Sequence, residues 1–294
     1  MRAAHPLEAE KPLSRFEEEL AGTPLWTIVW VLGATLLALA LVRALFSEPV
    51  LGRLTTALVS SSAMLFWVLR ATPHQDYQLR ELLGEPPRAS DWGTLLGVVS
   101  ANLGLGVALL ELGRMTGVQL TAPGPWLMAS SGVSAIIDVA NLVVFGALLA
   151  PIAEELVFRG VFFRKWRRTL GPVKGLLLSS ALFGVIHGGT MLPVAVAGLS
   201  FALLYTRTRS LWAPILAHIL NNCFSVAAVL VSWSFGGRSF ALNLTPAQTA
   251  ALLFASLAGL LAFGWQSAST LSAPLPPLRS APPMTAAQTQ ADSV

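Results

Sequence analysis

Runs of apolar residues long enough to cross a lipid bilayer recur along most of the chain. A spanning α-helix needs about 20 mostly apolar residues, and these runs do not alternate between apolar and polar residues as barrel strands do. Only 12% of the 294 residues are charged, whereas 54% are hydrophobic. A soluble domain carries about 25% charged residues, and a disordered chain has low hydrophobicity, so both classes are excluded. The sequence predicts an all-α fold, a polytopic transmembrane helical bundle.

The apolar runs predict about eight spans in one transmembrane domain, residues 25–265. A cytoplasmic segment with a short helix precedes it at residues 1–24, where Ser14 and Glu17 fit a capping box. A Pro/Ala-rich tail that we expect to be disordered follows it at residues 266–294. The expected spans are Leu25–Leu45, Thr55–Leu69, Gly93–Leu110, Ser134–Phe163, Val173–His187, Leu192–Thr206, Leu211–Val231 and Ala247–Trp265.

The distribution of Lys and Arg predicts the orientation of the bundle. If the eight spans alternate in direction, most basic residues fall on the side of the N-terminus. Cytoplasmic loops carry an excess of Lys and Arg, so we expect both termini in the cytoplasm. Basic loops also account for the net charge of +4 without a nucleic-acid partner, and a single Cys excludes an internal disulfide. The lipid bilayer is the expected partner, and short loops with an Ala/Leu-rich composition suggest a bacterial cytoplasmic (inner) membrane.

Ionisable residues inside spans are costly and are candidate functional residues by default. The fourth span carries Glu154, Glu155 and Arg159. Glu155 and Arg159 are four residues apart and can pair on one helix face, whereas Glu154 points about 100° away. We interpret the pair as a structural clamp and Glu154 as a group that faces the bundle interior. The alternative is that all three charges form a solvated helix end, because a basic run follows at residues 164–168.

The fifth and seventh spans carry further polar residues. Phe183 and His187 lie one turn apart, and His187 precedes two glycines, so taken alone it would cap a helix C-terminus. His218 and Asn222 share one face of the seventh span, and alone they would be polar contacts between helices. Asp138 lies about 24 Å before Glu154 along the helix, and we interpret it as structural.

The order of these motifs on three spans resembles the CPBP family of intramembrane proteases, which includes the type II CAAX prenyl endopeptidases (Rce1-like, Abi family). The motifs are Glu-Glu-x-x-x-Arg, Phe-x-x-x-His and His-x-x-x-Asn, within a core of residues 134–231. The resemblance implies that Glu154 and His187 activate a water molecule. It also implies that His218 and Asn222 hold the substrate carbonyl and stabilise the oxyanion. Glu155 and Arg159 would then support the site, and Phe183 would pack it.

The family implies an endopeptidase acting on a membrane-associated protein or peptide, which could be a prenylated CAAX protein, a leader peptide or a C-terminal sorting segment. No cofactor is favoured. Zinc is the alternative, held by Glu154, His187 and His218, because two His and one Glu form a known catalytic zinc set. The chain has no His-Glu-x-x-His motif to support it. Other functions that remain open are a non-catalytic scaffold or immunity-type protein of the same fold and, on weaker grounds, a transporter, since we find no internal repeat.

The expected depth of His187 conflicts with this site. The residue falls at the outer end of the fifth span, whereas the other motif residues lie in the cytoplasmic half or near the middle of the bilayer. We therefore expect the fifth span to be short or re-entrant, or the glycine turn after it to enter the bundle.

Overall fold

The computed structural model describes residues 83–118, 132–187, 190–234, 242–273 and 275. These residues are helical apart from short connections, and no strand occurs among them. The predicted all-α class is therefore confirmed for this part of the chain. The first two predicted spans, the short N-terminal helix and most of the C-terminal tail lie outside the described residues, so the total of eight spans stays a prediction.

Five of the described helical stretches are long and apolar enough to cross a membrane, which identifies an integral membrane protein. They match the third, fourth, sixth, seventh and eighth predicted spans. These are α5 (Asp91–Thr116), a continuous rod from Gly132 to Leu170, α10 (Met191–Thr208), α11 (Trp212–Ser234) and α12 (Pro246–Leu271). The last helix ends six residues beyond Trp265, so the predicted boundary at 265 was too early.

The rod is longer than predicted and changes its helical register twice. It consists of α6 (Gly132–Asn141), the π-helical segment η2 (Leu142–Leu149), α7 (Ala150–Glu155), the π-helical segment η3 (Leu156–Phe163) and α8 (Arg164–Leu170). The basic run at residues 164–168, which follows the predicted span, is helical, and Arg164 donates a hydrogen bond from Nε to the Tyr205 hydroxyl at 2.7 Å. π-Helical turns often accompany functional sites, and two of them flank α7 here.

The fifth predicted span is a helix, α9 (Pro172–Val185), but with 14 residues it falls short of a full crossing. At 1.5 Å per residue it is about 21 Å long, whereas the hydrocarbon core is about 30 Å thick. The chain enters α9 through Gly171, whose φ of 90° lies in the region that favours glycine. Because α9 ends early, as expected for a short fifth span, His187 Nε2 lies 3.8 Å from Glu154 Oε2.

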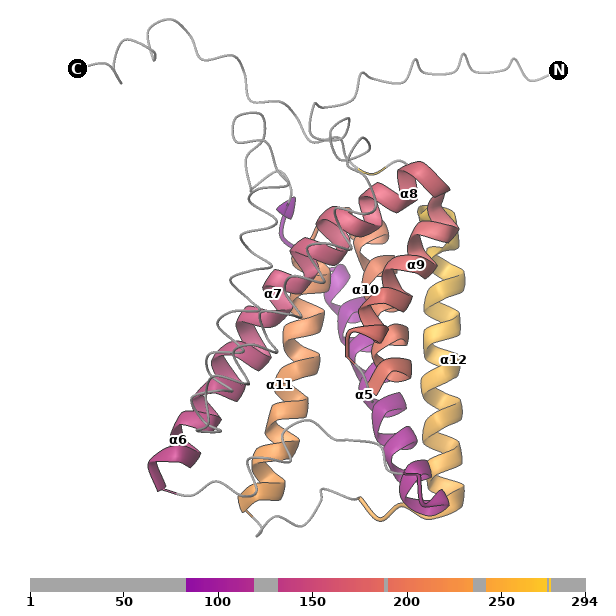
Figure 1. The fold of residues 1–294 in the computed structure, drawn as a ribbon. Coiled ribbons are helices and arrows are strands. Elements are labelled where there is room, and N and C mark those ends of the chain that lie inside the picture. The colour runs from indigo at the N-terminus through magenta and orange to yellow at the C-terminus, as the bar shows by residue number, and fades with distance from the viewer. Residues whose placement is uncertain (1–82, 119–131, 188–189, 235–241, 274, 276–294) are drawn as a thin grey trace, which may run out of the picture.

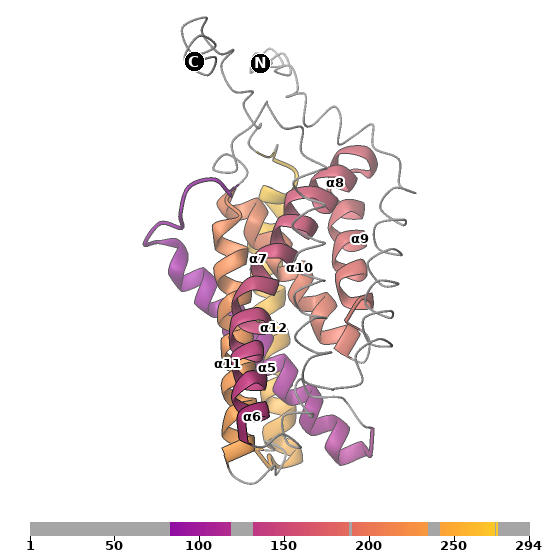
Figure 2. The same ribbon diagram turned by 60° about the vertical axis from the view of Figure 1, so that its left-hand side comes forward.

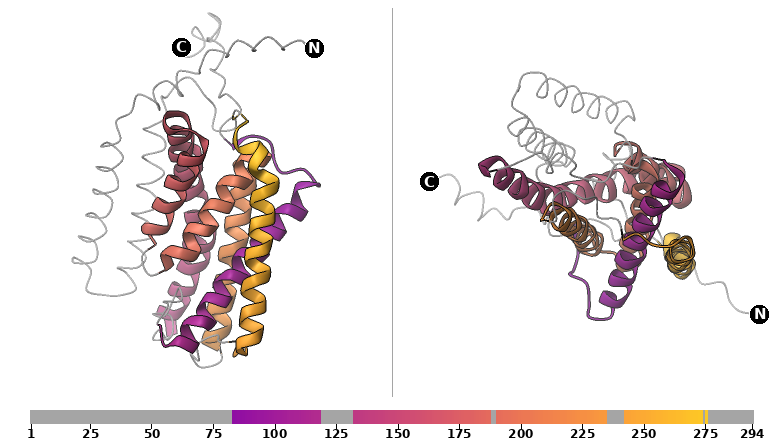
Figure 3. Two further views of the ribbon diagram at one scale, coloured as in Figure 1. Left: turned by 90° about the vertical axis from the view of Figure 1, so that its right-hand side faces the viewer. Right: turned by 90° about the horizontal axis from the view of Figure 1, so that it is seen from below.

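Helix α10 lies at the centre of the bundle and packs against α5, α9, α11 and α12 (Figure 1). Helices α5 and α12 form a long pair on one side, and the rod crosses over α11, which it contacts through η2 and α7 (Figure 2). Helices α8 and α9 lie side by side at one end (Figure 3). The core that these helices enclose is rich in aromatic residues, among them Phe158, Phe162, Phe183, Phe201 and Tyr205.

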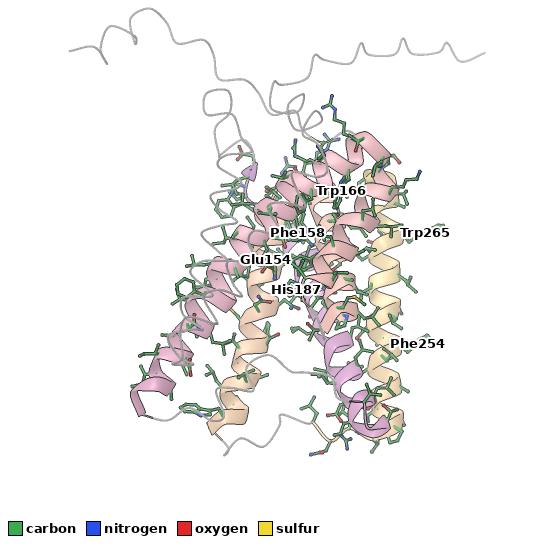
Figure 4. The ribbon with its side chains drawn as sticks, in the orientation of Figure 1. Glu154, Phe158, Trp166, His187, Phe254 and Trp265 are labelled. Carbon is green, nitrogen blue, oxygen red and sulfur yellow. The ribbon has the colours of Figure 1, made fainter. Side chains whose placement is uncertain are left out.

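The outward face of α12 is apolar, as expected for a helix in contact with lipid. Phe254, Leu261 and Trp265 are 76%, 72% and 85% exposed. Figure 4 shows Phe254 and Trp265 pointing away from the bundle. The basic helix α8 lies at the same end of the bundle as the C-terminal end of α12 (Figure 1). The orientation of the bundle in the membrane stays a prediction.

Candidate active site

Glu155 and Arg159 form a buried ion pair inside the rod. Arg159 Nη1 lies 2.7 Å from Glu155 Oε1, and both side chains are almost completely buried. The other arm of the guanidinium donates from Nη2 to the Gly198 carbonyl on α10 at 2.9 Å, and the group lies 4.6 Å from the centroid of the Phe183 ring. The predicted clamp is confirmed, and the alternative of a solvated helix end is wrong, because these charges are enclosed by three helices.

His218 is held on the same carboxylate from the opposite side of the bundle. Its Nδ1 lies 2.9 Å from Glu155 Oε1, and because a carboxylate only accepts, Nδ1 carries the proton. Phe201 on α10 stacks on the imidazole, with ring centroids 5.1 Å apart and planes 29° apart. Phe183 meets the same imidazole edge-on at 5.6 Å. These contacts fix the ring so that Nε2 points toward Glu154.

His187 is fixed by its own helix. Its Nδ1 donates to the Phe183 carbonyl, 2.6 Å away, in the last turn of α9. A carbonyl only accepts, so this ring also carries its proton on Nδ1 and presents Nε2 to the site. His187 thus caps the C-terminal end of α9 through Nδ1, and its Nε2 lies 3.8 Å from Glu154 Oε2.

Glu154 lies between the two imidazoles. Its Oε2 is 3.8 Å from Nε2 of His187 and 3.8 Å from Nε2 of His218. The Glu154 side chain is 13% exposed and that of His187 is 29% exposed, so among the described residues the site opens on the His187 side. Figure 4 shows Glu154 and His187 close to one another at mid-height of the bundle. Glu154 thus differs from its neighbour Glu155, whose carboxylate is fully enclosed.

Asn222 follows His218 by one turn on α11, but its recorded hydrogen bond leads to the rod. Its Nδ2 donates to the Gly146 carbonyl in η2 at 2.9 Å. The structure therefore brings six of the seven predicted residues into one cluster of direct contacts and places Asn222 at its edge. Asp138, interpreted as structural, is fully buried in α6.

Three further residues contribute to the site without being apparent from the sequence. Gly198 and Phe201 come from α10, which carries no motif, and Gly146 comes from η2. Two of them act through a backbone carbonyl, which leaves no signal in the side chain. A Cβ on Gly198 would lie 3.0 Å from Cδ1 of Phe183 and 3.4 Å from Nη2 of Arg159, so a larger residue there would require these side chains to shift.

The donors around Glu154 are of the types that zinc prefers. Both imidazoles face the site with Nε2, and each is oriented by a hydrogen bond on Nδ1, as metal-bound His residues usually are. Within the described ranges, however, no group of three His, Cys, Asp or Glu residues meets the spacing expected of metal ligands. The residues thus fit zinc in chemistry but not in the spacing that the structure shows.

Comparison with known proteins gives the same family as the motifs. Residues 137–224 match the family described as type II CAAX prenyl endopeptidase Rce1-like. A Bacillus subtilis protein named membrane peptidase YdiL is 30% identical over 137 residues, which cover 45% of this chain and 56% of that protein. The membrane-embedded CAAX protease MroQ of Staphylococcus aureus is 32% identical over 96 residues, covering 30% of this chain and 39% of MroQ.

The chain thus spans about half or less of the length of these relatives, and no solved structure matches it significantly. The matched region runs from within α6 to the first half of α11. It contains the Glu154 cluster, which consists of Glu154, Glu155, Arg159, Phe183, His187 and His218. Residues 137–224 of the chain therefore resemble the Rce1-like CAAX protease family.

Proposed function

We propose that this protein is an intramembrane endopeptidase and that Glu154 is its general base. The observation that carries the proposal is the position of Glu154 Oε2, 3.8 Å from Nε2 of His187 and 3.8 Å from Nε2 of His218. These separations are too long for direct hydrogen bonds. A water oxygen could lie about 2.8 Å from both Glu154 Oε2 and His187 Nε2. Such a water molecule would contact Glu154 as the base and the His187 imidazole as a second hydrogen-bonding group.

His218 is placed to polarise the substrate carbonyl. The Glu155 carboxylate accepts from its Nδ1, and Nε2 faces Glu154 at 3.8 Å. When Nε2 carries a proton, it could donate to the oxyanion that forms on the substrate carbonyl.

The remaining roles follow from this assignment. Glu154 would take a proton from the water as the hydroxide attacks the scissile carbonyl carbon, and His187 would hold the water in place. His218 and Asn222 would stabilise the oxyanion, and the proton on Glu154 would then pass to the leaving amine. Glu155, Arg159 and Phe183 hold the acting groups in place and do not contact the reacting atoms.

Zinc is the competing way to activate the same water. The ion, held by Glu154, His187 and His218, would supply a Lewis acid at that position. Base catalysis by Glu154 and activation by zinc predict different results when the purified protein is assayed in lipid vesicles with a chelator. Base catalysis by Glu154 predicts that exhaustive chelation leaves the rate of hydrolysis unchanged. Loss of activity that returns on addition of zinc would refute it.

The substrate is a membrane-associated protein or peptide, and the position of the site narrows where it is cut. His218 lies six residues from the start of α11, which is about 9 Å along the helix axis. If both termini are cytoplasmic, this end faces the cytoplasm, so cleavage occurs in the cytoplasmic half of the bilayer. We propose a bacterial cytoplasmic membrane as the location. As substrate we favour a leader peptide or sorting segment over a prenylated protein.

The experiment that tests the function compares new protein termini in membranes from cells that carry the wild-type chain or the Glu154→Gln variant. The proposal predicts a set of C- or N-termini that appears only with the wild type. The uncut precursors should accumulate with the variant and co-purify with it. Identical termini in both membranes, at equal levels of inserted protein, would exclude a peptidase that depends on Glu154.

A further inference from the structure

The carbonyl oxygen of Gly146 accepts a hydrogen bond from a side chain although it lies inside a helical rod. Asn222 Nδ2 on α11 donates to it at 2.9 Å. A carbonyl in an α-helix ordinarily accepts from the backbone amide four residues later, and in a π-helix from the amide five residues later. For Gly146 these are the amides of residues 150 and 151.

Neither backbone donor is available to Gly146. The N–H of Ala150 donates to the Phe145 carbonyl, five residues earlier, which is the π-helical register of η2. The next residue is Pro151, which has no N–H. Polar groups that lack a partner in an apolar medium are costly, so the Gly146 carbonyl requires a donor from elsewhere. The amide of Asn222 supplies it.

This contact determines which end of the Asn222 amide faces the rod. One N–H of Nδ2 is committed to Gly146, and because the amide group is planar, the second N–H and Oδ1 are fixed with it. Asn222 lies one turn beyond His218, whose Nε2 points toward Glu154. An oxyanion donor must be aimed before the reaction to be effective, and the Gly146 carbonyl provides this orientation.

We propose that Pro151 is a positioning residue for Asn222. By withholding an N–H and following a π-helical turn, it leaves the Gly146 carbonyl to the Asn222 side chain and so aims the second N–H of that amide. The inference rests on the role proposed above for Asn222 in stabilising the oxyanion. It explains why a proline occupies the middle of a membrane-spanning rod, three residues before Glu154.

The test is the Pro151→Ala variant, which restores an N–H that can reach the Gly146 carbonyl in the π-helical register. The chain has five asparagines, so a protein labelled with ¹⁵N-asparagine gives few side-chain amide signals, and Asn222→Asp identifies the pair that belongs to Asn222. We expect Pro151→Ala to shift this pair and leave that of Asn102, which bonds to Ser200, in place. We also expect kcat to fall roughly tenfold with little change in KM.

Two comparisons separate positioning from a general structural effect. Pro246→Ala is the matched control, because Pro246 is in the first turn of α12, where no helical acceptor awaits an N–H. It should alter neither the Asn222 signals nor kcat. In an Asn222→Ala background, Pro151→Ala should cause no further loss of kcat, because the residue it orients is gone.

An Asn222 signal that is unchanged in Pro151→Ala overturns the inference, whatever the rate. Equal losses of kcat from Pro151→Ala with and without Asn222 overturn it as well. If Pro151→Ala does not insert into the membrane, Pro151→Ser restores the same N–H and takes its place. The amide signals do not depend on catalysis, so a wild-type chain without peptidase activity would refute the proposed function and leave the hydrogen-bond test intact.

Discussion

Glu154 and Glu155 are adjacent in the chain and face different nitrogens of one imidazole. Glu155 Oε1 lies 2.9 Å from Nδ1 of His218, and Glu154 Oε2 lies 3.8 Å from its Nε2. The Glu155 carboxylate is fully buried and also contacts Arg159, whereas the Glu154 carboxylate lies between two imidazoles and is partly exposed. The two carboxylates therefore have different roles. Glu155 orients the His218 ring, and Glu154 lies where it can contact a water molecule.

Replacing each glutamate by glutamine should separate stability from activity. Glu155→Gln removes the charge that compensates the buried Arg159, which should cost about 3 kcal/mol or more of unfolding free energy. Glu154→Gln should cost less than about 1 kcal/mol, because its two recorded contacts are 3.8 Å long. Thermal unfolding of the purified variants in one detergent measures the difference. Equal losses in stability would contradict the division of roles.

Arg159→Lys should destabilise the protein even though it keeps the charge. The guanidinium contacts Glu155 with one arm and the Gly198 carbonyl with the other, a fork that a single ammonium group does not reproduce. Leaving the buried carbonyl without its donor should cost roughly 1–3 kcal/mol. The same unfolding assay checks this expectation. A lysine variant as stable as the wild type would show that the charge alone matters.

Gly198→Ala should disturb the site from the side of α10. The added Cβ would lie 3.0 Å from Cδ1 of Phe183, whose ring touches both imidazoles and whose carbonyl anchors His187. We expect a loss of roughly 1–3 kcal/mol in stability together with reduced hydrolysis. Gly106→Ala in α5 is the control, since no atom lies within 4 Å of its added Cβ. Unchanged behaviour of both variants would mean that α10 does not confine the site.

The orientation can be tested with single cysteines in a Cys223→Ser background. Lys174→Cys, near the start of α9, should react with an impermeant thiol reagent only from the cytoplasmic side. Val118→Cys, just after α5 and 58% exposed, should react only from the opposite side. Both positions are exposed and neither contributes to the Glu154 cluster. The reverse pattern of labelling would show that the bundle has the opposite orientation in the membrane.

The sequence predicted the polar half of the site well and the apolar half poorly. Glu154, Glu155, Arg159, His187 and His218 stand out because charged and polar residues are rare in membrane spans, and helical spacing relates the first three correctly. Phe201 and Gly198 do not stand out, because aromatic residues and glycines are common throughout the apolar runs. Their roles depend on how α10 packs against α9 and the rod, which periodicity along one helix does not reveal.

The length of α9 and the two π-helical segments also escaped prediction. The apolar run from Val173 to His187 does not show that the helix ends at Val185, and this early end is what brings His187 to Glu154. A π-helical turn shifts the register of one hydrogen bond and leaves the apolar pattern nearly unchanged. Pro151 was the one local signal of altered hydrogen bonding near η2.

The rate of peptide-bond hydrolysis by the Glu154→Gln variant tests the central claim most directly. The wild type and the variant should be reconstituted in lipid vesicles at equal amounts of folded protein and given a precursor that accumulates in cells carrying the variant. A general base contributes about 10²–10⁴-fold to the rate, so we predict a loss of at least about 100-fold with unfolding temperature preserved. A variant that cleaves this substrate within a few-fold of the wild-type rate would contradict the account.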